Sequence, residues 1–206
     1  MTTILKIDSS VYSRDGQSSQ LGRQFAEALR ARQPGARLIE RDLAAEPVPH
    51  LDAARFQAFL TKPAERTPEQ QAVAALSDSL IDELRRADVI LLGLPMYNFG
   101  VPSQLKAYFD HVARAGVTFQ YTDKGPVGLL TGKKAYVFAT RGGNYAGTPG
   151  DTQTAYVRQF LGFLGITDVE FVYAEGLALG AAARDASLAR ARSAVQNLAP
   201  PVALAA

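Results

Sequence analysis

The chain has no cysteine, no excess of one charge and no long apolar run. Without cysteine, it can have no disulfide bonds, thiolate catalysis or cysteine-ligated zinc or iron–sulfur sites. The net charge is only +2, which favours neither nucleic acid nor an acidic membrane surface as a partner. No run reaches the roughly 18 apolar residues of a membrane-spanning helix. The amino-terminus has no secretory pattern, so we expect a cytoplasmic protein.

Several motifs of catalysis and nucleotide binding are also missing. There is no Gly-Lys-Ser/Thr of a Walker A loop and no Gly-x-Gly-x-x-Gly, which argues against a dinucleotide pyrophosphate site. Neither His-Glu-x-x-His nor Gly-x-Ser-x-Gly occurs. We therefore expect no bound metal and no protein nucleophile.

Strand and helix patterns alternate five times along the chain. With 206 residues, of which 47% are hydrophobic, the chain suits one domain spanning 1–206. The alternation predicts the α/β class with a parallel sheet. The five strands are expected at Ile4–Ile7, Arg37–Arg41, Val89–Leu94, Ala135–Ala139 and Val169–Tyr173.

The connections carry helical periodicity and capping signals. Helices are expected at about 18–32, 67–86, 103–115, 152–165 and 181–198. Thr67, Pro68 and Gln70 form a capping-box pattern, and Gly116 suits the end of the third helix. The stretch 43–66, with three prolines, is expected to be irregular, and 118–130 to be a small hairpin. His111 lies inside a helix and is interpreted as a surface or packing residue.

The third strand is followed by an unusual loop. Val89–Leu94 is continuously apolar, as in a strand buried on both faces, and it ends at Pro95. Met96, Tyr97, Asn98 and Phe99 come directly after it. Open α/β sheets bind ligands at the carboxyl ends of their strands. Aromatic side chains at that edge indicate a flat cofactor or a partner subunit that covers them.

The loops after the first and fourth strands complete this pattern. Residues 8–19 are rich in serine just before a helix, whose amino-terminus favours a phosphate; Ser18 acting only as the helix N-cap is the plain alternative. Residues 140–145 place Gly142 and Gly143 after a strand, which allows close backbone approach to a ligand or simply a tight turn. Together, the loops indicate a mononucleotide site.

Eight segments in order resemble the FMN-dependent NADH:quinone oxidoreductases known as azoreductases, which have a flavodoxin-like fold. The segments are IDSS at 7–10, GQSSQL at 16–21, RDLAA at 41–45, LPMYNF at 94–99, QLKAYFD at 104–110, ARAGVTFQYT at 113–122, TRGG at 140–143 and FLGFLGITDV at 160–169. The resemblance implies a doubly wound five-stranded sheet of order 2-1-3-4-5 with helices on both faces. It also implies a homodimer with the active site at the subunit interface.

The resemblance further implies which residues hold FMN. They are Ser10, Gly16, Gln17 and Ser18 at the phosphate, and Met96, Tyr97, Asn98, Phe99, Thr140, Arg141, Gly142 and Gly143 at the isoalloxazine ring. Two positions depart from the family pattern. Gly16 stands where a serine is frequent, and Tyr145 stands where a histidine is frequent.

The expected reaction is reduction of quinones by NAD(P)H, and cleavage of azo compounds to amines in two rounds of two-electron reduction. The flavin carries the chemistry, with assistance from Asn98 and Tyr145. Phe119, Tyr121 and Phe163 are expected to wall the substrate space. One shared flavin face predicts ping-pong turnover. The alternatives are an electron carrier passing electrons to a protein partner and a flavin-free module on the same fold.

Overall fold

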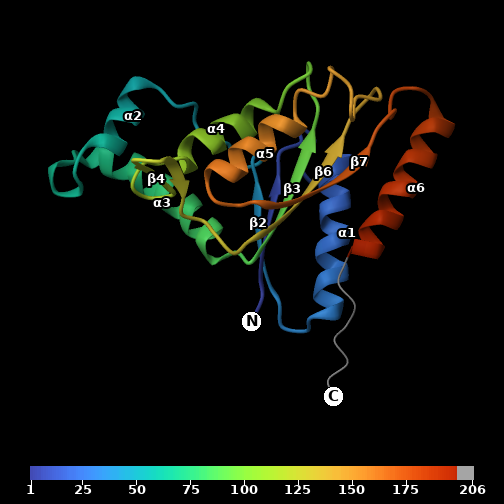
Figure 1. Ribbon diagram of the computed structural model, residues 1–206, viewed down its shortest axis with the longest axis horizontal. Coiled ribbons are helices and arrows are strands. Elements are labelled where there is room, and N and C mark those ends of the chain that lie inside the picture. The colour runs from blue at the N-terminus through green and yellow to red at the C-terminus, as the bar shows by residue number, and fades with distance from the viewer. Residues whose placement is uncertain (199–206) are drawn as a thin grey trace.

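The computed structural model describes residues 1–198 and contains a five-stranded parallel sheet (Figure 1). The strand order is β2-β1-β3-β6-β7, which confirms the expected order because β6 and β7 are the fourth and fifth strands of the sheet. All four neighbouring pairs are parallel. The strands are β1 (Thr3–Asp8), β2 (Arg37–Asp42), β3 (Val89–Pro95), β6 (Lys134–Thr140) and β7 (Asp168–Ala174).

Helices cover both faces of the sheet, as Figure 1 shows. One face carries α1 (Gln17–Arg32) and α6 (Ala181–Leu198); the other carries α3 (Pro68–Arg86), α4 (Ser103–Val112) and α5 (Thr154–Phe163). Strands covered on both faces need apolar side chains on both, which is why β3 reads as one apolar run. Within residues 1–198, no helix is long and apolar enough to cross a membrane.

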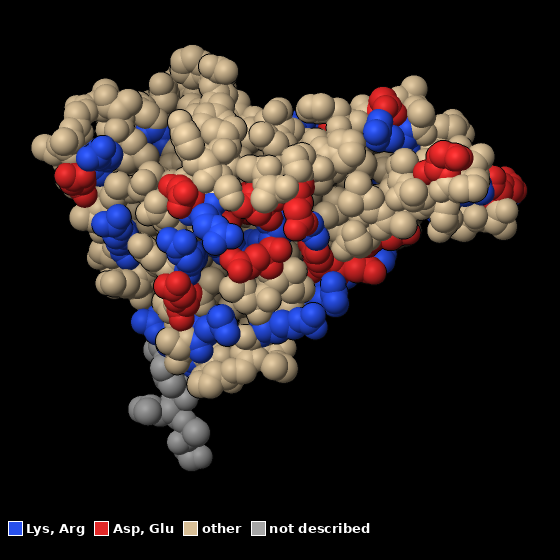
Figure 2. Space-filling model, turned by 180° about the vertical axis from the view of Figure 1, so that it is seen from behind, with Lys and Arg blue, Asp and Glu red and all other residues tan. Residues whose placement is uncertain are grey.

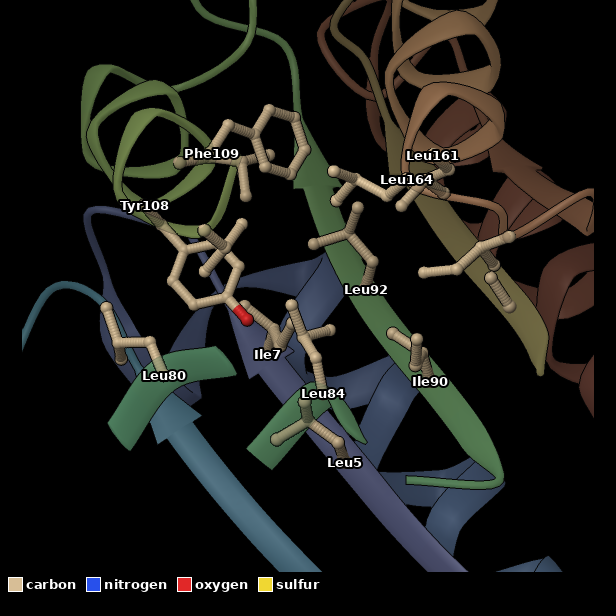
Figure 3. Close-up of a cluster of buried hydrophobic side chains, with 14 of the residues drawn as sticks. Leu5, Ile7, Leu80, Leu84, Ile90, Leu92, Tyr108, Phe109, Leu161 and Leu164 are labelled. Carbon is tan, nitrogen blue, oxygen red and sulfur yellow. The ribbon is translucent and has the colours of Figure 1, made fainter. Parts of the chain in front are cut away.

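The sheet separates two hydrophobic cores. Leu5 and Ile7 of β1 point toward Leu80 and Leu84 of α3, in the cluster drawn in Figure 3. Ile4 points the other way, into the cluster of α1 and α6. Successive strand residues face opposite sides, so one strand supplies both cores. This packing fixes the carboxyl edge of the sheet, where the site lies.

The expectation that 43–66 is irregular is wrong. The stretch contains α2 (Ala53–Leu60) and a 3₁₀ turn at Pro63–Glu65. Asp52 starts α2 by accepting a hydrogen bond from the Arg55 backbone N–H (2.8 Å). The prolines lie outside α2 and do not interrupt it.

His111 fastens this segment to α4. Its ring is fully buried, and Nε2 donates to the Pro49 carbonyl at 3.0 Å, since a carbonyl can only accept. Phe59 of α2 packs edge-on against the ring, with centroids 5.6 Å apart. Burial holds the pKa of His111 below its ordinary value. The packing role expected for His111 is confirmed.

Helix α4 ends at Val112, three residues before the expected end, so Gly116 is not its terminal glycine. Thr118 Oγ1 donates to the Val112 carbonyl (2.7 Å) and accepts from the Arg114 N–H (3.0 Å). This side chain satisfies groups that another helical turn would have paired. Gly116 instead has φ +75° in the turn that leads into the hairpin.

The hairpin is confirmed as β4 (Phe119–Thr122) and β5 (Gly125–Gly128), paired antiparallel. It is fastened to the α5–β7 connection by main-chain contact. A Cβ on Gly128 would overlap the backbone of Leu164 and Gly165, and Gly165 has φ +99°. The Leu130 N–H also donates to the Leu164 carbonyl at 2.8 Å. Only glycine at 128 allows this approach.

Candidate ligand site at the carboxyl edge of the sheet

The three predicted loops meet around a cavity of about 190 Å³. Of the expected residues, Ser10, Gly16, Gln17, Met96, Tyr97, Thr140, Arg141 and Gly142 line it; Tyr12, Pro95 and Leu177 line it as well. Sequence reasoning missed Tyr12 and Leu177. Their signals were an aromatic in the serine-rich loop and a fifth strand ending at the same sheet edge. A second hollow of about 450 Å³ includes Phe99 and Tyr156. We assign the ligand site to the smaller one because all three loops contribute to it.

The start of α1, after β1, has hydrogen-bond donors without partners among the described residues. Helix α1 begins at Gln17, and its N-cap residue, Gly16, has no side-chain cap bond. The alternative of Ser18 as N-cap is therefore wrong. The hydroxyls of Ser18 and Ser19 are buried and have no partner within the described part of the chain. Free amides at a helix amino-terminus are donors that suit a phosphate group, and Gly16 and Gln17 line the cavity, so the start of α1 fits one.

The glycine at position 16 has a local steric reason. A Cβ there would overlap the side chain of Ser10. Ser10 Oγ accepts from the Tyr12 N–H at 3.2 Å and lies 3.3 Å from the Tyr97 hydroxyl. Gly16 thus lets Ser10 sit against the start of α1 and join the first loop to the second.

The loop after β3 is a tight turn that holds an aromatic side chain outward. Asn98 and Phe99 have φ of 49° and 62°, and the Gly100 N–H donates to the Tyr97 carbonyl at 2.9 Å. This left-handed backbone costs about 1–2 kcal/mol per residue. Gln153 Nε2 offsets it by donating to the carbonyls of Pro95 and Gly100 (3.0 and 2.9 Å). Phe99 stays 60% exposed, with its ring edge-on to Tyr145.

The loop after β6 is organised by the side chain of Arg141, which is fully buried. Its guanidinium pairs with Asp151 at 2.7 Å and Glu175 at 3.1 Å, and it lies 5.1 Å from the ring centre of Tyr173. Burial alone would raise the pKa of Asp151, but hydrogen bonds from Arg141 and Thr154 outweigh it and lower that pKa. The positive charge of Arg141 is therefore paired with carboxylates within the protein.

Three backbone carbonyls of this loop face the segment after β7. Those of Arg141, Gly142 and Gly143 accept from the N–H groups of Leu177 (3.1 Å), Ala178 (2.9 Å) and Gly176 (3.0 Å). No peptide here is cis, and a trans peptide points its N–H opposite to its carbonyl. The next N–H groups along the chain, of Gly142, Gly143 and Asn144, therefore point away from residues 176–178. We call these three groups the amide array. Residues 1–198 offer them no acceptor, and such an array favours negative charge.

The expected substrate wall does not border the cavity of the same chain. Phe119 packs on Phe163, with centroids 4.3 Å apart, and stands edge-on to Tyr121 at 5.5 Å. Tyr121 is 74% exposed, at the hairpin. None of the three lines the cavity. They form a separate aromatic cluster, which we call the hairpin cluster.

The back of the molecule carries charges of both signs. Figure 2 shows blue and red side chains interleaved on that face, with a mostly uncharged upper edge. No group of three or more His, Cys, Asp or Glu residues among 1–198 is placed to hold a metal ion. The chemistry of the site lies in backbone amides, hydroxyls and aromatic rings.

Comparison with known proteins adds sequence and structural relatives. A family model described as "Flavodoxin-like fold" matches residues 2–199. The FMN-dependent NADH:quinone oxidoreductase 6 of Burkholderia lata is 55% identical over 195 residues, covering 95% of this chain and 98% of the relative. The FMN-dependent NADH:quinone oxidoreductase of Alcanivorax borkumensis is 57% identical over 190 residues, covering 92% and 96%.

Two solved structures with similar folds are azoreductases by name. The azoreductase AzrA superposes with a TM-score of 0.87 at 27% identity, covering 96% of this chain and 99% of AzrA. An FMN-dependent NADH-azoreductase of Bacillus anthracis, in complex with FMN, gives 0.84 at 27% identity, covering 97% and 100%. The similarity runs through the whole of both folds.

Proposed function

The chain belongs to the Flavodoxin-like fold family and, within it, to the FMN-dependent NADH:quinone oxidoreductases, and on that premise we propose that it uses FMN and NADH to reduce quinones and azo compounds. The observation that carries the proposal is the cavity at the sheet edge. The amino-terminus of α1, at Gly16 and Gln17, and the first member of the amide array, Gly142, both line it. A mononucleotide with one phosphate and a flat ring requires both.

The residues divide between the two ends of the cofactor. The Ser10 and Ser18 hydroxyls and the first amides of α1 would bind the phosphate. Met96 and Tyr97 would contact the ring, and Asn98 and Phe99 would border it. The array of Gly142, Gly143 and Asn144 would stabilise negative charge at the ring edge. When bound, FMN supplies the hydride chemistry, and the protein positions it.

The sheet edge offers one flat surface to both substrates. With no second nucleotide-binding motif in the sequence, the nicotinamide and the acceptor would stack at the same place. Two flat molecules cannot share it, so NAD⁺ would leave before the acceptor binds. An azo bond takes up two hydrides and two protons to become two amines, which requires two rounds. NADPH as donor and a cytoplasmic location remain predictions.

A homodimer would complete the site. The hairpin cluster lies outside the cavity of its own chain, yet Tyr121 is exposed. Exposed aromatic area of this kind is typical of an interface or a binding surface. We infer that the hairpin cluster of one subunit walls the acceptor space of the other. Asn98 and Tyr145 would assist from within the subunit.

The proposal is tested by flavin analysis and steady-state kinetics. Mass spectrometry of the heat-released cofactor should give FMN; mainly FAD would contradict the assignment. Double-reciprocal plots with NADH and NADPH at several fixed menadione concentrations should give parallel lines. Intersecting lines would mean separate sites for donor and acceptor. An electron carrier would oxidise NADH with menadione slowly and would require a protein partner, so the same assay separates the two functions.

A further inference from the structure

Glu175, the residue directly after β7, holds the far end of the loop that carries the amide array. Its Oε1 accepts from the backbone N–H groups of Tyr145 (2.8 Å) and Ala146 (2.9 Å), and from Arg141 Nη1 (3.1 Å). Its side chain is 16% exposed. A carboxylate that binds two consecutive amides and a buried guanidinium fixes the path of residues 141–146.

The main chain of Glu175 fixes the other side of the array. Its N–H donates to Ser187 Oγ of α6 at 3.0 Å, and Ser187 is buried. The next three residues, Gly176, Leu177 and Ala178, are those whose N–H groups bind the carbonyls of residues 141–143. Glu175 therefore anchors both segments that orient the array, residues 141–146 and residues 176–178.

From this geometry we propose that Glu175 is the positioning residue of the amide array and thereby sets how strongly the site prefers reduced over oxidised FMN. The inference rests on the proposed function, because it requires FMN in the cavity. Glu175 does not line the cavity, so it acts through residues 142–144. Amides fixed in advance stabilise charge that develops on reduction, whereas mobile amides must first reorganise.

The reach and the charge of Glu175 have opposite effects on that preference. Arg141, Asp151 and Glu175 together carry one net negative charge, which opposes negative charge on a nearby ring. Removing the charge would favour reduction. Shortening the side chain by one methylene, about 1.5 Å, would release the array and disfavour reduction. The sign of the change therefore separates positioning from charge.

The experiment measures the midpoint potential of bound FMN at saturating cofactor in two variants. Glu175→Asp keeps the charge and shortens the reach; Glu175→Gln keeps the reach and removes the charge. Glu170→Asp and Glu170→Gln, on the preceding strand β7 and paired with Lys134, are the matched controls. We expect Glu175→Asp to lower the preference for reduced FMN about tenfold, which shifts a two-electron potential by about 30 mV to more negative values.

Glu175→Gln should leave the potential unchanged or make it more positive, and both controls should leave it unchanged. An unchanged potential in Glu175→Asp would overturn the inference, and so would a shift of both Glu175 variants in the same direction. If the wild-type protein bound no FMN, the proposed function itself would fail. The two failures are therefore distinguishable.

Discussion

The loop after β1 and the loop after β6 border the same cavity but treat their polar groups in opposite ways. The first leaves Ser18 and Ser19 unpaired and α1 without a side-chain cap. The second pairs the terminal nitrogens of Arg141 with Asp151 and Glu175, leaves Arg141 Nε without a partner among the described residues, and turns backbone amides away from residues 176–178. The side-chain donors at the start of α1 have no partner without a ligand, whereas the charges of the second loop are paired within the protein.

This difference indicates where each loop contributes free energy. Unpaired buried donors weaken the ligand-free fold and gain most when an anion arrives. A paired internal network contributes to the fold with or without ligand. Mutations in the two loops should therefore separate into effects on affinity and effects on stability.

The largest effect should come from Arg141→Met, which removes the positive charge that Asp151 and Glu175 pair with in the loop after β6. Asp151 and Glu175 would be left with less compensation, and removal of one partner from a buried ion pair costs about 3–5 kcal/mol. Urea unfolding of the ligand-free protein would measure this. Arg158→Met, on an exposed helix position near Phe171, is the control and should cost far less. Equal losses in the two variants would remove the distinction between the loops.

Ser18→Ala should act on the other end. Its buried hydroxyl has no partner among the described residues, so its removal should not lower the ligand-free stability. A hydrogen bond to a charged group contributes about 1.5–3 kcal/mol, so FMN affinity should fall roughly 10- to 100-fold. FMN titration followed by fluorescence gives the affinity, with Ser79→Ala on α3 as control. Unchanged affinity would mean that Ser18 does not face the phosphate.

Tyr121→Ala tests whether a third region, in neither loop, handles the acceptor. Loss of one stacking ring is worth about 1 kcal/mol, so the quinone KM should rise roughly fivefold while FMN content stays constant. Val127→Ala, on the same hairpin, is the control for hairpin order. Loss of FMN with unchanged acceptor kinetics would place Tyr121 in the flavin cradle instead.

The smallest effect is the pH dependence of stability, which should have opposite signs for Asp151, the partner of Arg141, and Asp8, the last residue of β1. The pKa of Asp151 is lowered, so its contribution is present above the ordinary value of 3.8 and is lost as the pH falls through the folded-state pKa. Burial raises the pKa of Asp8 despite its ion pair with Lys6. Its contribution is therefore present below 3.8 and is lost as the pH rises through the folded-state pKa.

Urea unfolding of wild type, Asp8→Asn and Asp151→Asn between pH 3 and 7 would measure both contributions. The wild-type-minus-variant difference should grow with pH for Asp151 and shrink with pH for Asp8. Slopes of the same sign would show that the two carboxylates are linked to folding in the same way.

Sequence reasoning located what depends on local patterns. The strands follow apolar runs, and the Thr67–Gln70 capping box is present. Sequence reasoning failed where a side chain outside a segment determines its structure. Thr118 sets where α4 ends, and His111 holds the segment around α2 in place. The meeting of the three loops followed from the sheet order. Glu175 gave no signal, because a single glutamate after a strand has no distinctive spacing.

The contact between Gly128 and Gly165 limits how the hairpin can change. Because the backbone of Gly128 touches that of Leu164 and Gly165, the base of the hairpin is packed directly against the segment that follows α5. Insertions near position 128 would separate the chains, whereas the exposed tip at Asp123 and Lys124 lies free of this joint. Variation in the length of the hairpin should therefore gather at its tip and leave the placement of Tyr121 intact.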